Sequence, residues 1–93
     1  MNEQDAFDEL LEKVASLHSH EELRQFFYEI LTVGEIRDIG MRWTLLKRLV
    51  AGESQRKIAQ DLKISLCKIT RGSKILKENG MVASLLNTKR VTE

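Results

Sequence analysis

The sequence predicts an all-α fold, and three observations support this prediction. Apolar residues recur at intervals of three and four along most of the first 50 positions, which is the spacing of one helical face. Capping signals stand between these periodic stretches, at positions where helices would start. No stretch combines the alternating apolar and polar pattern of a β-strand with turn signals.

Three helices are expected in the N-terminal half. Their apolar faces consist of Phe7, Leu10, Leu11, Val14 and Leu17; of Leu23, Phe26, Phe27, Ile30 and Leu31; and of Ile36, Ile39, Trp43, Leu46, Leu49 and Val50. Ser19 with Glu22, and Thr32 with Glu35, have the form of a capping box, which satisfies backbone donors where a helix begins. Gly52 is expected to end the third helix.

The small size of the chain predicts a homodimer. A domain of 93 residues and 10.7 kDa buries a marginal fraction of its surface by itself. A single cysteine, Cys67, excludes an internal disulfide framework, and no Cys/His cluster suggests a metal site. We therefore expect the first two helices to pack against a second subunit, with a monomeric helical bundle as the alternative.

The charges are divided between the two parts of the chain. Residues 1–41 carry a net charge of −7 and residues 42–77 a net charge of +8, although the whole chain sums to +1. A basic segment of this kind is typical of proteins that bind a polyanion, and the alternative is two solvated faces of opposite sign. The acidic N-terminus does not resemble a signal peptide, and no run of 18 apolar residues could span a membrane. We expect a cytoplasmic protein.

Residues 54–77 have the pattern of a helix-turn-helix. Ser54 and Ser65 are expected to cap helices over residues 55–62 and 66–77, joined by a tight turn at Lys63 and Ile64. The inward positions would be Ile58, Ala59, Leu62, Ile64, Ile69, Gly72 and Leu76. Lys68, Arg71 and Lys74 make one edge of the second helix cationic. A basic second helix at a tight turn predicts binding of double-stranded DNA.

The expected organisation is one domain over residues 1–93. It comprises core helices for dimerisation over 5–52, the helix-turn-helix over 54–77, and a short C-terminal helix with a frayed tail over 81–93. No paired carboxylates, activated nucleophile or phosphate-binding loop are apparent, so we do not expect an enzyme.

Several segments together resemble the tryptophan repressor family. They are residues 31–32, Glu35, Arg42, residues 52–56 and, most specifically, the run Ile-Thr-Arg-Gly-Ser at 69–73. A weaker similarity extends from about residue 5 to residue 86. The resemblance implies an intertwined all-helical homodimer that binds operator DNA only when L-tryptophan is bound as corepressor.

The resemblance also implies roles for individual residues. Arg42 and Arg71 would sandwich the indole ring, and the Arg71 guanidinium and the Thr32 hydroxyl would meet the ligand carboxylate. The Leu31 carbonyl would accept a hydrogen bond from the ligand ammonium, and Gly72 would leave room beside the ring. The positions that match DNA contacts are Gln55, Arg56, Ser65, Leu66, Cys67, Lys68 and Thr70.

The chain departs from the family pattern at three places. Ile75 stands where the family has a serine that helps to hold the ligand amino group, and Lys68 where a threonine usually touches phosphate. The segment 52–54 is one residue shorter than the family form. Ile75 and the shortened segment leave open a related DNA-binding dimer that ignores tryptophan. A second alternative is a helical module whose basic face binds an acidic protein.

Overall fold

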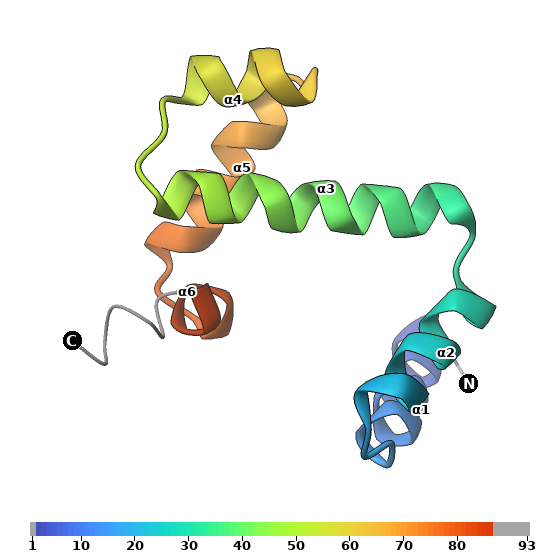
Figure 1. The fold of residues 1–93 in the computed structure, drawn as a ribbon. Coiled ribbons are helices and arrows are strands. Elements are labelled where there is room, and N and C mark those ends of the chain that lie inside the picture. The colour runs from blue at the N-terminus through green and yellow to red at the C-terminus, as the bar shows by residue number, and fades with distance from the viewer. Residues whose placement is uncertain (1, 87–93) are drawn as a thin grey trace. The chain divides into compact units, whose positions relative to one another are not determined.

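The computed structural model describes residues 2–86, which form six α-helices and no strand (Figure 1). The helices are α1 (Glu3–Ala15), α2 (His20–Ile30), α3 (Val33–Val50), α4 (Gln55–Leu62), α5 (Leu66–Lys77) and α6 (Met81–Leu86). The all-α prediction is confirmed. None of these helices is both long enough and apolar enough to cross a membrane. The predicted frayed tail, residues 87–93, lies outside the described residues.

The chain divides after Ile36 into two compact units. In the first unit, the Ser19 hydroxyl accepts a hydrogen bond from the Glu22 amide at 3.0 Å, which confirms the predicted start of α2. Neither α1 nor α2 contains a buried residue. Their apolar faces form as predicted, but the described residues of the chain leave Phe7 58% and Ile30 52% exposed.

Both ends of α3 have the predicted caps. The Glu35 amide donates to the Thr32 hydroxyl at 3.1 Å, and the Thr32 amide donates to the Glu35 carboxylate at 2.9 Å, which is a reciprocal capping box. At the other end, the Gly52 amide donates to the Leu49 carbonyl at 3.0 Å and the Glu53 amide to the Arg48 carbonyl at 3.2 Å. This is a Schellman motif, and it requires the left-handed backbone that Gly52 adopts with φ 88°.

The second unit is built around a small core between α3, α4 and α5. Leu45, Ile58 and Ile69 are 3%, 0% and 0% exposed. Packed against them are Leu49, Ala59, Leu62 and Ile64, so the predicted inward positions of residues 58–69 are confirmed. This core holds α4 and α5 against the C-terminal half of α3 (Figure 1).

The turn between α4 and α5 accepts a residue with a side chain. Lys63 adopts the left-handed conformation at φ 55°, where glycine is the usual residue, and the Ile64 amide donates to the Ala59 carbonyl at 3.3 Å. The Ser54 and Ser65 hydroxyls accept from the amides of Lys57 and Lys68 at 3.1 and 3.3 Å, as the sequence predicts. Residues 54–77 therefore form a helix-turn-helix with the predicted boundaries.

One expectation about α3 is wrong for the single chain. The sequence places Trp43 and Ile39 on the apolar face of the third helix, but they are 43% and 50% exposed. The face of α3 that meets the other helices passes through Leu45 and Leu49, which contact α5 at Gly72. Trp43 lies two positions before Leu45, which turns its side chain roughly 200° around the helix axis from that face.

Candidate functional site

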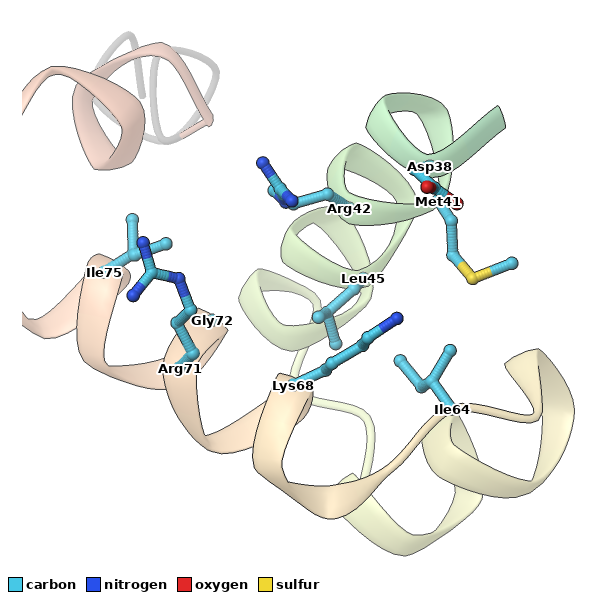
Figure 2. Close-up of a pocket in the computed structure, with 9 residues that line it drawn as sticks. All are labelled: Asp38, Met41, Arg42, Leu45, Ile64, Lys68, Arg71, Gly72 and Ile75. Carbon is cyan, nitrogen blue, oxygen red and sulfur yellow. The ribbon is translucent and has the colours of Figure 1, made fainter. Parts of the chain in front are cut away.

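A crevice lies between α3 and α5, with a cavity volume of about 250 Å³ (Figure 2). Ligand sites for drug-sized molecules span roughly 300–1,000 Å³, so the crevice has room for a single small molecule. The residues that α3 contributes are Asp38, Met41, Arg42 and Leu45. The turn and α5 contribute Ile64, Lys68, Arg71, Gly72 and Ile75. The spacing on α3, with intervals of three and four, places its four residues on one helical face.

Three cationic side chains line the crevice, against a single acidic one, Asp38. Figure 2 shows Arg42 and Arg71 reaching into the space between α3 and α5, and Lys68 extending toward α3. In residues 2–86, none of these three cations forms an ion pair or a side-chain hydrogen bond. The crevice therefore offers unneutralised positive charge and apolar walls together, which suits an anionic group on a flat apolar body.

Gly72 brings α5 close to α3 at the floor of the crevice. A Cβ atom at this position would lie 3.2 Å from Leu45 Cδ2 and 3.3 Å from Leu49 Cδ1, tighter than most real contacts. The sequence resemblance implies that Gly72 leaves room beside a ligand. The structure adds that Gly72 also permits the approach of the two helices that form the crevice.

Of the five residues predicted to bind the ligand, the crevice brings together Arg42, Arg71 and Gly72. Leu31 and Thr32 belong to the first unit, at the junction of α2 and α3. The Thr32 hydroxyl oxygen accepts the capping hydrogen bond described above, which leaves its proton free to be donated.

The seven residues predicted to contact DNA are all exposed. Six of them lie at the starts of the two helices: Gln55 and Arg56 open α4, and Ser65, Leu66, Cys67 and Lys68 cap or open α5. Thr70 lies in the second turn of α5. Free backbone amides and the positive end of the helix dipole favour phosphate at such positions. Leu66, next to these polar residues, is 61% exposed, so its side chain is available for an apolar contact with a binding partner.

Sequence reasoning missed part of the site. Asp38 and Met41 line the crevice but were not predicted, and Lys68 was predicted only as a DNA contact. Asp38 lies one turn before Arg42 on the same helical face and could have been found by projecting back from it, whereas Met41 lies one turn before Leu45. In the part of the chain that the structure describes, no three His, Cys, Asp or Glu residues converge to hold a metal ion.

These features define a small helix-turn-helix protein with a cationic crevice beside its second helix. The chain belongs to the Trp repressor family, since the family model described as "Trp repressor protein" matches residues 5–89. It is 33% identical over 75 residues to a Trp operon repressor homolog of Chlamydia caviae, covering 80% of this chain and 74% of that protein. A homolog of the same name from Xylella fastidiosa (strain M23) is 30% identical over 82 residues, covering 87% and 89% of the two chains. No solved structure matched the chain.

Membership of this family shows the general role of the protein. It is a transcriptional regulator of the tryptophan-repressor type, and the family is regulatory and not enzymatic. The helical architecture agrees with that assignment, since residues 2–86 contain six α-helices and no strand.

Proposed function

We propose that the protein is a homodimeric repressor that binds operator DNA through α4 and α5 when L-tryptophan occupies the crevice. The observation that carries the proposal is the pair of unpaired arginines, Arg42 on α3 and Arg71 on α5, at one crevice beside the helix-turn-helix. The similarity to proteins named Trp operon repressor homolog supports the same ligand. This function implies a cytoplasmic location.

The ligand chemistry follows from the residue types. Guanidinium planes stack on aromatic faces, so Arg42 and Arg71 would hold an indole ring between them. Arg71 would also bind the ligand carboxylate, together with the hydroxyl of Thr32, and the carbonyl of Leu31 would accept from the ammonium. Gly72, at the floor of the crevice, would lie beside the ring.

The DNA chemistry belongs to the starts of α4 and α5. The amides at the start of α5, together with Ser65, Lys68 and Thr70, would contact phosphates. Gln55 and Arg56 at the start of α4 would reach backbone or base edges, and Leu66 and Cys67 would complete the contact surface. Such contacts displace counterions, so the DNA affinity would fall steeply as salt is raised.

The crevice couples the two binding events because α5 forms one of its walls and also carries the DNA-binding residues. A ligand between α3 and α5 would fix the position of α5, and in a dimer two such helices must stand about 34 Å apart to enter successive major grooves. A ligand that binds this arrangement preferentially raises its population. A coupling free energy of about 1–3 kcal/mol is typical of such systems.

Mobility-shift titrations with and without L-tryptophan test this function. We expect Arg42→Ala and Arg71→Ala to lose the response to tryptophan and to keep their helical circular dichroism, because the arginines line the crevice and are not part of the core. Arg37→Ala is the matched control, since Arg37 lies on α3 but does not line the crevice. Calorimetry that finds the same tryptophan affinity in both crevice variants as in the unmodified chain would contradict the assignment.

A second candidate is a DNA-binding dimer that does not respond to tryptophan. It is favoured by Ile75, which lines the crevice with an apolar side chain where the family pattern has a serine for the ligand amino group. Absence of heat on titration with millimolar L-tryptophan, with DNA binding retained, would select this candidate. DNA binding that is absent, or insensitive to salt, would instead favour a module for an acidic protein partner.

A further inference from the structure

Arg48 joins three successive segments of the second unit. It lies in the last turn of α3, and its Nη2 atom is 2.6 Å from Asp61 Oδ2 on α4. Its Nε atom is 2.8 Å from Oε1 of Glu53, which belongs to the hinge between α3 and α4, residues 51–54. The Arg48 backbone carbonyl also accepts from the Glu53 amide at 3.2 Å. One residue thus holds both the hinge and the far end of α4.

The pairing is selective within the basic segment. Residues 42–77 contain ten Lys and Arg residues but only two acidic ones, Glu53 and Asp61. Both carboxylates bind Arg48. In the described chain the other nine cations of this segment form no ion pair, including Arg42, Lys68 and Arg71 in the crevice. The two acidic residues therefore hold Arg48 at the hinge and leave the crevice and the proposed DNA-binding surface of the protein positively charged.

The hinge needs such a constraint. Gly52, at φ 88°, permits a wide range of backbone conformations, and only residues 51–54 separate α3 from α4. One side of α4 is held by Ile58, which is fully buried in the core with Leu45. Arg48 holds α4 through Asp61, a contact separate from that apolar core. Rotation of α4 about the hinge would have to break both sets of contacts.

We propose that Arg48 is a positioning residue that presets the helix-turn-helix against α3 before any ligand binds. The proposal rests on the proposed function, because it assigns part of the DNA-competent arrangement to the chain itself and only the remainder to the ligand. It follows that Arg48 governs how much of the DNA affinity depends on the ligand.

The first test is hydrogen exchange of the α4 amides in the full chain. Arg48→Met keeps the aliphatic part of the side chain and removes the guanidinium group that binds Glu53 and Asp61. Lys47→Met is the matched control, since Lys47 is an exposed neighbour with the same charge and no ion pair. We expect exchange over residues 53–62 to rise about fivefold in Arg48→Met and to stay unchanged in Lys47→Met, from the usual strength of exposed ion pairs. Equal exchange in the two variants would overturn the proposal.

The second test is DNA affinity with and without L-tryptophan. In Arg48→Met we expect the affinity of the ligand-free protein to fall about fivefold and that of the ligand-bound protein to fall less, so that the ratio between them widens. An equal loss in both states, or the same loss in Lys47→Met, would overturn the positioning role. Arg48→Lys keeps the charge but not the guanidinium group, so its loss of DNA affinity should lie between those of the unmodified chain and Arg48→Met. It replaces Arg48→Met in the test if that variant does not fold. If the unmodified chain binds no DNA, the proposed function fails while the exchange data still decide whether Arg48 holds α4.

Discussion

Arginines of the basic segment, residues 42–77, differ in whether an acidic side chain forms an ion pair with them. Arg48 is bound by two carboxylates, and both hydrogen bonds raise its pKa further above an already high value. Arg42 and Arg71 have no such partners in the described residues and line a crevice instead. Residue type alone does not distinguish them. The distinction lies in which helical face each arginine occupies and whether an acidic residue reaches that face.

Two helical glycines of the second unit provide a test of close packing. We expect Gly72→Ala to lower the free energy of unfolding, because its Cβ would press on Leu45 and Leu49 at 3.2 and 3.3 Å. Overpacking costs about 1–3 kcal/mol, and alanine returns about 1 kcal/mol of helix propensity. Gly40→Ala should stabilise the protein by up to about 1 kcal/mol, since a Cβ added at Gly40 would meet no described atom within 4 Å beyond its chain neighbours and its own helix backbone.

Urea denaturation of both glycine variants measures the difference. Opposite signs of the change in unfolding free energy are the expected result. If Gly72→Ala proved more stable than the unmodified chain, the side chains of Leu45 and Leu49 would have to shift away from the new Cβ without loss of packing energy. The burial of Leu45, at 3% exposure, argues against this.

At the scale of the elements, the helix boundaries were predictable because their causes are local. Ser19, Thr32, Ser54 and Ser65 each accept a hydrogen bond from an amide three residues later, so the sequence contains both partners within one turn. The same holds for Gly52, whose positive φ ends α3. Local rules were therefore sufficient for five helix ends.

Contacts between elements were less predictable. The Arg48–Asp61 pair spans 13 positions, and the exposure of Trp43 depends on which face of α3 meets α5. The inward residues Ile58 and Ile69 were predicted because the helix-turn-helix imposes a fixed spacing. Met41 was missed because nothing near it in the sequence reveals that α5 packs opposite.

The contact between α3 and α4 should depend on pH. The hydrogen bond from Arg48 is the main cause that lowers the pKa of Glu53, and the same holds for the pKa of Asp61. Because these pKa values are lower in the folded than in the unfolded chain, the stabilisation is fully present above about pH 4–5 and is lost as the pH falls through the lowered values. We expect the urea midpoint to fall more between pH 6 and pH 3 for the unmodified chain than for Arg48→Met.

Parallel pH dependence in the two proteins would show that Glu53 and Asp61 do not stabilise the fold through Arg48. Lys47→Met again serves as the control, and it should follow the unmodified chain at both pH values, because Lys47 binds neither carboxylate.

For the whole molecule, apolar side chains left exposed to water are the main energetic cost of the single chain. Large apolar side chains of α1, α2 and α3 remain more than a third exposed in the single chain: Phe7, Leu11, Phe27, Tyr28, Ile30, Val33, Ile39 and Trp43. The buried hydrophobic core comprises Leu45, Leu46, Ile58, Ile69 and Ala83 among the described residues. Such a core is small for a chain of 93 residues, and a helical face with several large exposed apolar side chains is typical of an interface.

We therefore predict that the protein is a dimer at micromolar concentration, with α1 and α2 covered by the second copy. Size-exclusion chromatography with light scattering should give a mass near twice 10.7 kDa. Phe7→Glu and Ile30→Glu, each placed on an exposed apolar face, should raise the dissociation constant at least tenfold, since a charge buried without a partner costs several kcal/mol. Glu12→Gln on α1 is the control and should leave the mass unchanged. A mass near 10.7 kDa for the unmodified chain would exclude the dimer, and with it the paired spacing of α5 that binding to successive major grooves requires.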